Sequence, residues 1–326
     1  MTTALPSSPS YQLACDIIDN EPLAFWLPLL VNIQNQYRLG EGEWSRVADG
    51  ANALFEFEQG YIVKIVPPNW LHQGEKEIAA DELFKQSKSD FPLNRPKIIA
   101  FADHNGWLYI LMSKLPGTCL ASLWPELTMD NKMLIIRQLG AYMRSLRALA
   151  NHDSKVLTVR WHKYVQSLKE NCLQRHQRNN LSSELYAQVL PFVEQHLADL
   201  PDAASMFVHM DLHPGNLMVE HKQGNWHLTG VLDFGDALFC HGPWLEILTP
   251  ICFMAQGDSE LYKTLLNSYG LIDGVDMNQL QNAMMALALV REASNINFVM
   301  QQVPSCIGMR NWEQIAQQLF PAINLG

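Results

Sequence analysis

Two short stretches of the sequence decide the fold. The first reads VHMDLHPGNLMV over residues 208–219, and the second reads GVLDFGD over residues 230–236. In the first stretch Asp211 precedes Asn216 by five residues, and in the second Asp233 follows an apolar run. Three oxygen-bearing side chains are thus set beside residues that favour β-strands.

The apolar residues next to these side chains predict a β-hairpin. Residues 217–219 and 228–232 have strand composition, and residues 221–225 between them would form the tip. One strand would follow Asn216 and the other would deliver Asp233. Pairing of the two strands would hold both side chains in one place.

This set of side chains suits phosphoryl transfer. The transferring group carries spread negative charge, so an enzyme must supply Mg²⁺ and position the reactants. Mg²⁺ prefers oxygen ligands and usually takes one or two carboxylates. We predict Asn216 and Asp233 as its ligands, and Asp211, with His209 in the same loop, as the catalytic residues that receive or orient the hydroxyl proton. His209 alone is more often a structural residue, but H-x-D-L-x-x-x-N followed by D-F-G is typical of kinases.

A lysine in the first third of the chain supports this interpretation. Residues 53–58 and 61–66 are β-prone runs around Gln59-Gly60 and predict a hairpin. Lys64 lies in the second run, which is otherwise apolar apart from Tyr61. It is either a surface residue of an edge strand or a phosphate ligand, and the Asp–Asn–Asp set favours the phosphate role.

A helix predicted over residues 73–87 would supply a partner for the lysine. Its candidates are Glu75, Glu77 and Glu82. Glu77 is favoured because apolar residues follow it directly, although the choice among the three stays open. A glutamate there would hold the ammonium group of Lys64 in place.

Other nucleotide contacts are predicted with less support. Residues 49–52 precede the first strand and would form a turn over the phosphates through Asn52, yet they contain one glycine, so an ordinary turn is equally consistent. Strands at 97–101 and 107–112 flank an Asn105-Gly106 turn. The segment after them, with Ser113 and Leu115, would offer backbone groups to adenine.

The order of these patterns predicts an α+β chain with two lobes. Residues 1–40 form a loose lead-in and one helix, residues 41–115 a small β-rich nucleotide-binding lobe, and residues 116–326 a larger, mostly helical lobe with the catalytic loop, metal site and acceptor pocket. Helical spacing of apolar residues is found at 130–150, 161–177, 183–200 and from 246 onward.

Composition excludes several classes of function. The 326 residues are 48% hydrophobic and 17% charged, which is typical of globular proteins, and the net charge is −10. Without a Lys/Arg-rich run, binding to nucleic acid is not expected. The longest apolar run, residues 23–33, contains a proline and is too short to span a bilayer, and no signal peptide is expected. Six scattered cysteines favour a reducing compartment, so we predict a cytoplasmic monomer or homodimer.

At these residues the chain resembles the aminoglycoside phosphotransferase and choline kinase-like superfamily. The likeness spans roughly residues 46–270 and rests on the strand YIVK 61–64, Glu77, MSKLPG 112–117, LGAYMRSL 139–146, the 209–216 loop, DFGD 233–236 and GPWLE 242–246. It implies a bilobal protein-kinase-like fold, ATP or GTP, Mg²⁺ and a small hydroxylated acceptor. By carry-over, Asp211 is the catalytic aspartate, Asn216 and Asp233 are the metal ligands, and Lys64 is the phosphate lysine.

The chain departs from this family at two positions. The family often has glycine where this sequence has Met210, and its helix often ends in Leu-His where this sequence has Leu146-Arg147. Neither departure removes a catalytic atom.

The acceptor is less well specified by the sequence. Residues 201–326 contain twelve carboxylates and four Lys or Arg, which fits either a solvated acidic surface or a cleft for a cationic substrate. Asp236 and Glu246 are candidate acceptor contacts, although surface acids are commoner. A protein kinase would show A-P-E after D-F-G, whereas residues 239–250 continue directly into an apolar helical pattern. A nucleotide-binding pseudokinase and an interaction scaffold are further alternatives.

Overall fold

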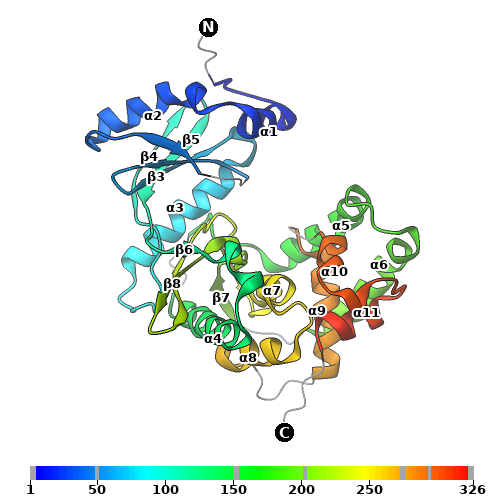
Figure 1. The fold of residues 1–326 in the computed structure, drawn as a ribbon. Coiled ribbons are helices and arrows are strands. Elements are labelled where there is room, and N and C mark those ends of the chain that lie inside the picture. The colour runs from blue at the N-terminus through cyan, green and yellow to red at the C-terminus, as the bar shows by residue number, and fades with distance from the viewer. Residues whose placement is uncertain are drawn as a thin grey trace. The chain divides into compact units, whose positions relative to one another are not determined.

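The chain forms two compact units in the computed structural model, which describes residues 5–47, 51–149, 154–200, 204–271, 277–292 and 295–321. Unit 1 comprises Met1–Gln86, Asn94–Pro116 and Leu232–Asp236, and unit 2 comprises Ser87–Leu93, Gly117–Val231 and Ala237–Gly326. The main boundary falls within the Pro-Gly connector of the sequence. Unit 1 is rich in strands and unit 2 in helices, so the predicted α+β class is confirmed (Figure 1).

Unit 1 is built on a five-stranded antiparallel sheet in the order β1-β2-β3-β5-β4. The strands are β1 (Trp44–Arg46), β2 (Ala53–Phe57), β3 (Tyr61–Val66), β4 (Ile98–His104) and β5 (Trp107–Ser113). The predicted hairpins are present, and Asn105 and Gly106 have φ of 56° and 85°, which the tight turn between β4 and β5 requires. The three-residue strand β1 was not predicted.

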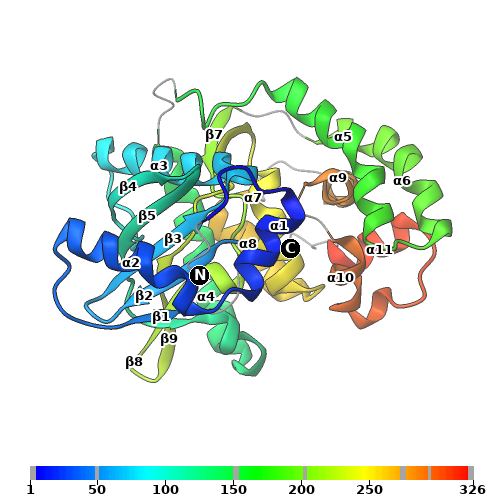
Figure 2. The same cartoon turned by 90° about the horizontal axis from the view of Figure 1, so that it is seen from above.

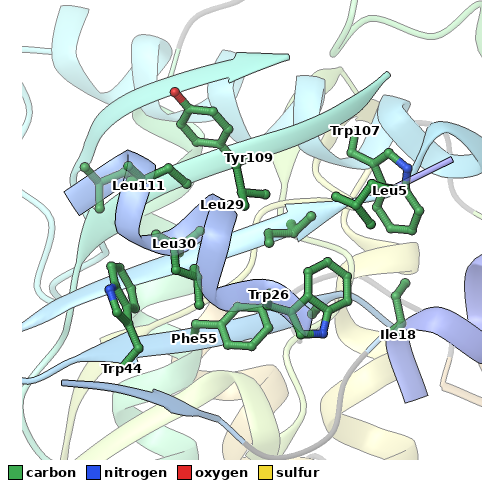
Figure 3. Close-up of a cluster of buried hydrophobic side chains, with 14 of the residues drawn as sticks. Leu5, Ile18, Trp26, Leu29, Leu30, Trp44, Phe55, Trp107, Tyr109 and Leu111 are labelled. Carbon is green, nitrogen blue, oxygen red and sulfur yellow. The ribbon is translucent and has the colours of Figure 1, made fainter. Parts of the chain in front are cut away.

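Helices cover both faces of this sheet. They are α1 (Tyr11–Asn20), α2 (Leu23–Tyr37) and α3 (Leu71–Gln86). Side chains alternate between the faces of a strand. On one face Phe55, Trp107 and Tyr109 pack with Trp26 and Leu30 of α2 (Figure 3). Leu108 and Ile110 lie on the other face and contact α3 at Gly74.

The expectation of a loose lead-in is wrong for residues 11–20, which form α1. The Ser10 hydroxyl caps this helix by accepting the Leu13 N–H, and Ala14, Ile17 and Ile18 are buried. The chain before the helix is also held, because Trp107 Nε1 donates to Pro6 O at 2.8 Å. Contacts with the distant sheet, which sequence periodicity does not reveal, order this segment. Figure 2 shows α1 and α2 from above.

Unit 2 is mostly helical. Its helices are α4 (Met129–Ser145), α5 (Trp161–Arg178), α6 (Ser183–His196), α7 (Trp244–Pro250), α8 (Ser259–Tyr269), α9 (Met277–Val290), α10 (Ile296–Gln301) and α11 (Trp312–Leu319), with a π-helical turn at Ile251–Ala255. Helices α5, α6 and α11 pack around α9 (Figure 2). Helix α4 packs closely on α8, because a Cβ at Gly140 would lie 2.0 Å from Ser268 Oγ.

Short 3₁₀ turns connect these elements in both units. They are Pro68–Trp70, Leu120–Ser122, Trp124–Glu126, Leu146–Ala148, Leu197–Asp199, Pro214–Asn216 and Pro304–Cys306. The turn at Pro214–Asn216 contains the predicted metal ligand Asn216 and leads directly into the strand Leu217–Lys222. In the part of the chain that the structure describes, no helix is long and apolar enough to cross a membrane.

Two small sheets complete unit 2. One contains β6 (Thr118–Cys119), β8 (Leu217–Lys222) and β9 (Asn225–Val231), and the other pairs β7 (Ser205–Val208) with β10 (Leu238–His241). The predicted hairpin is β8–β9, with Gln223-Gly224 as its turn. Gly117, which begins the second segment of unit 2, has φ of +104°, and a Cβ there would lie 2.7 Å from Val219 O, so only glycine fits.

Strand β10 corrects the prediction that residues 239–250 pass directly into a helix. Leu238–His241 pairs antiparallel with β7, and helix α7 begins only at Trp244. A short buried apolar run does not by itself distinguish strand from helix.

Candidate active site

Lys64 lies at the centre of the unit 1 sheet. Its strand β3 is flanked by β2 and β5, which rules out the alternative of an edge-strand surface residue. The side chain is on the face that α3 covers, and Lys64 Nζ is 2.8 Å from Glu77 Oε2. Glu77 is 6% exposed, whereas Glu75 and Glu82 are exposed on the helix. The structure therefore identifies Glu77 as the partner of Lys64.

A second carboxylate completes this ion cluster. Asp233 Oδ1 is also 2.8 Å from Lys64 Nζ and accepts the Gly235 N–H at 3.1 Å. Burial alone would lower the pKa of Lys64, but Asp233 and Glu77 outweigh it and raise that pKa above its ordinary value. The lysine is consequently held charged at all physiological pH values, and burial raises the pKa of Glu77 despite the neighbouring cation.

The backbone at Asp233 is strained. Its φ is +59°, a left-handed conformation that non-glycine residues rarely adopt and that is concentrated at functional sites. The next residue, Phe234, is buried and packs edge-to-face against Phe84 of α3, with ring centroids 5.3 Å apart. The Asp233 side chain itself is 43% exposed. A half-exposed carboxylate oriented by a buried lysine fits a ligand for Mg²⁺.

The remaining predicted nucleotide contacts also lie in unit 1. Asn52 is buried and its Oδ1 accepts from Trp70 Nε1 at 2.9 Å, so only its amide nitrogen would be left for a nucleotide. The Ser113 N–H and Oγ both bond to the backbone of Lys97. Leu115 is 8% exposed. Asp49 and Gly50 of the expected phosphate turn lie outside the described residues. These nucleotide roles stay predictions.

In unit 2 the catalytic loop holds Asp211 and Asn216 together. Asn216 Nδ2 donates to Asp211 O at 2.9 Å and to Asp211 Oδ2 at 3.1 Å. Because both bonds use the amide nitrogen, the amide oxygen lies outside them. That oxygen is the atom through which asparagine binds Mg²⁺, so the side chain fits the predicted metal ligand. No group of three His, Cys, Asp or Glu side chains gathers to hold a metal among the described residues.

His213, which the sequence analysis did not single out, orients the other side of Asp211. Its Nδ1 accepts the Gly215 N–H at 3.0 Å, so Nδ1 carries no hydrogen and Nε2 does. Nε2 lies 3.4 Å from Asp211 Oδ2. His213 therefore presents its Nε2–H to the carboxylate.

Asp211 is held in its ionised form. Burial would raise its pKa, but His213, Arg291 and His209 outweigh burial and lower the pKa below its ordinary value. Arg291 Nη2 lies 3.6 Å from Asp211 Oδ1. Arg291 is 81 residues from Met210, the residue preceding Asp211, and no local pattern in the sequence marks it.

Two of the predicted site residues, His209 and Glu246, are buried. His209 is fully buried and its Nδ1 accepts the Asp211 N–H at 3.2 Å, which suits positioning of the loop and not contact with substrate. Glu246 is 1% exposed and accepts the Met210 N–H at 2.7 Å, so burial argues against an acceptor contact. Asp236 is half-buried, 3.5 Å from Gln73 Nε2 in unit 1, and its predicted role stays untested.

Comparison with known proteins decides the family. Residues 43–280 match the model of the phosphotransferase enzyme family, known as APH. The chain belongs to this family. The predicted resemblance and the enzyme class are therefore confirmed, and the protein is a phosphotransferase. A search of curated proteins returns no match to the sequence.

Solved structures agree with the fold of this phosphotransferase. Aminoglycoside phosphotransferase APH(2'')-Ib bound to ADP is 13% identical, with a TM-score of 0.60 over 90% of this chain and 99% of the other. The GDP and kanamycin complex of APH(2'')-IIIa is 15% identical, with a TM-score of 0.64 over 86% and 98%. APH(3'')-Id from Streptomyces rimosus with ADP and streptomycin is 16% identical, with a TM-score of 0.59 over 82% and 98%. These similarities confirm the predicted kinase-like fold.

Proposed function

We propose that this phosphotransferase moves the γ-phosphoryl group of ATP or GTP to a hydroxyl of a small acceptor. The observation that carries the proposal is the ion cluster of Lys64, Glu77 and Asp233. It fixes one buried ammonium, Lys64 Nζ, at 2.8 Å from Glu77 Oε2 and at 2.8 Å from Oδ1 of the half-exposed Asp233 carboxylate. A cation for phosphate oxygens and a carboxylate for a metal are the two groups that nucleotide phosphates require.

The residues of unit 1 would bind the nucleotide phosphates. Lys64 would present its point charge to phosphate oxygens while Glu77 holds the side chain in place. Asp233 and the amide oxygen of Asn216 would hold Mg²⁺, which supplies positive charge to the phosphates when bound. ADP, GDP and ATP complexes among the similar structures support the choice of nucleotide.

In unit 2, Asp211 would orient the acceptor hydroxyl. Its lowered pKa makes it a weak base at neutral pH. A loose phosphoryl-transfer transition state demands little proton removal beforehand, so orientation of the hydroxyl is the larger task. His213 and Asn216 fix the carboxylate for that task through contacts to Oδ2 of 3.4 Å and 3.1 Å.

The acceptor class we propose is a hydroxylated amine such as an aminoglycoside. The similar structures include complexes with kanamycin, streptomycin and gentamicin. Twelve carboxylates against four Lys or Arg in residues 201–326 would favour a cationic acceptor over an anionic one.

The test is transfer of labelled phosphate from [γ-³²P]ATP and GTP, with Mg²⁺, to a panel of aminoglycosides, choline, hydroxylysine and sugars. The proposal predicts a labelled product that Asp211→Ala abolishes. Transfer to a protein substrate alone would favour a protein kinase. Nucleotide binding without any transfer would favour a pseudokinase, and no binding at all would favour a scaffold.

A further inference from the structure

The residue before Asp211 has an unfavourable backbone conformation. Met210 has φ of +74°, in the left-handed region where a methionine side chain is strained against the backbone. It is also 6% exposed, so its side chain is packed in the interior of unit 2. A strained conformation of this kind persists only where the surroundings hold it.

Three buried side chains hold the backbone of Met210. Its N–H donates to Glu246 Oε2 at 2.7 Å, and its carbonyl oxygen accepts from Thr249 Oγ1 at 2.8 Å and from Arg291 Nη2 at 2.7 Å. Glu246 and Thr249 belong to α7, whereas Arg291 follows the last residue of α9. All three are at most 6% exposed.

Arg291 differs from the other two because it also lies beside the carboxylate. Its Nη2, which bonds Met210 O, is 3.6 Å from Asp211 Oδ1. A buried guanidinium is costly unless charged and polar partners surround it. Here the partners are the strained backbone carbonyl and the carboxylate of the next residue.

We propose that Arg291 is a positioning residue that keeps Met210 in its left-handed conformation and thereby orients Asp211. The inference rests on the proposed function for the role of Asp211. It makes the end of α9 a part of the catalytic loop's support, together with α7. It also accounts for how a methionine is held at φ of +74°, a conformation that glycine adopts without strain.

Arg291 is not needed merely to attach the end of α9. Arg175 of α5 donates to the carbonyls of Val290 and Leu168, and His176 Nε2 contacts Leu289 O at 2.8 Å. These two residues already bind the last turn of the helix. The guanidinium of Arg291 instead contacts Met210 and Asp211 in the loop. Attachment of the helix end and support of the loop are therefore carried out by different side chains.

The test combines Arg291→Met with Met210→Gly in the full chain. Glycine adopts φ of +74° without strain, so Met210→Gly should reduce the dependence on Arg291. Arg291→Met should lower kcat about tenfold or more, with KM for Mg·ATP changed by less than about twofold. Arg291→Lys, which retains one donor for Met210 O, should keep part of kcat. Met210→Gly also empties a buried site and lowers Tm by itself, so the further losses of Tm and kcat that Arg291→Met causes should be compared with the Met210→Gly single variant, and they should be smaller there than in the wild type.

Arg175→Met is the matched control, because it removes a guanidinium that bonds the neighbouring residue of α9. It should lower Tm without lowering kcat. The inference is overturned when Arg291→Met lowers Tm equally with and without Met210→Gly, or leaves kcat at the wild-type value. If Arg291→Met does not fold, Arg291→Lys carries the same comparison. Absence of transfer by the wild type would contradict the proposed function, while the Tm comparison would still decide whether Arg291 holds Met210.

Discussion

At the scale of single residues, Lys64 is expected to contribute both to stability and to the proposed nucleotide binding. It is 3% exposed and makes two ion pairs of 2.8 Å. Lys64→Met would leave the buried Glu77 carboxylate without its cation, so we expect unfolding free energy to fall by about 3 kcal/mol. Affinity for Mg·ATP should fall as well. Urea denaturation and calorimetric titration measure the two effects.

Lys114, which directly follows β5, provides a matched control in unit 1. Its Nζ is 2.6 Å from Glu56 Oε1, but both side chains are substantially exposed. Lys114→Met should therefore cost less than about 1 kcal/mol and leave nucleotide affinity unchanged. Equal losses for the two lysine variants would show that burial of the Lys64 cluster is not what stabilises unit 1.

The raised pKa of Glu246 predicts that the stability of the folded protein depends on pH. Burial raises its pKa from 4.5 to about 7 in the folded chain. The folded state therefore binds the Glu246 proton more tightly than the unfolded state does. The contribution of this proton to the unfolding free energy is complete below pH 4.5 and is lost as pH rises toward 7. The loss corresponds to about 3 kcal/mol.

Glu246→Gln should remove this dependence, because glutamine does not ionise and still offers an oxygen to the Met210 N–H. The difference in unfolding free energy between the variant and the wild type should shift in the variant's favour between pH 4.5 and 7.5. Glu126→Gln, at an exposed position, is the control. A difference that stays constant with pH would contradict the raised pKa.

At the scale of elements, the close packing of α4 on α8 should make Gly140 an exception to the usual effect of glycine-to-alanine exchange in a helix. Glycine-to-alanine exchange inside a helix normally stabilises by about 1 kcal/mol. At Gly140 a Cβ would lie 2.0 Å from Ser268 Oγ and 2.9 Å from Ser268 Cβ. Gly140→Ala should therefore destabilise unit 2 by about 2 kcal/mol in urea denaturation. Ser268→Gly in the same chain should recover part of that loss, and a stabilising Gly140→Ala would refute this close packing.

Hairpins and helices whose own residues carry a clear turn or periodicity signal were predicted from the sequence. The β2–β3 and β8–β9 hairpins follow from β-prone runs around glycine-containing turns, and the spacing of apolar residues in α4 is helical. Helix α1 and strand β10 were missed because distant partners order them: the unit 1 sheet for α1 and strand β7 for β10. Periodicity within a short segment does not contain that information.

The same limit applies to the candidate site. Asp211, Asn216 and Asp233 were predicted as site residues because their motifs have a short and characteristic spacing. Arg291 was not predicted from the sequence, because its contact with Met210 spans 81 residues. The burial of Glu246 and His209 was not predicted, because sequence shows an acid or a histidine without showing that it is buried. His213 lies two residues before Gly215 and accepts its N–H, so this short spacing was the signal in the sequence that could have pointed to His213.

At the scale of the whole molecule, the two proposed roles, nucleotide binding and orientation of the acceptor, belong to residues of two compact units. Lys64, Glu77 and Asp233 belong to unit 1, and Asp211 and Asn216 belong to unit 2. Membership of the phosphotransferase family fixes the reaction class. The acceptor is not fixed by the fold, because acceptor choice depends on the shape and charge of individual side chains.

The most direct test of the central claim compares Asp211→Asn with Asp233→Asn for Mg·ATP binding and for phosphoryl transfer. Asp233→Asn should lose the Mg²⁺-dependent part of nucleotide binding. Mg·ATP at one hundred times its Kd stabilises the folded wild type by about 2.7 kcal/mol and so raises its Tm. The variant should not show this rise in Tm. Asp211→Asn should keep that binding and lose transfer by about a hundredfold or more. Transfer at the wild-type rate by Asp211→Asn, or undiminished Mg·ATP binding by Asp233→Asn, would contradict the account.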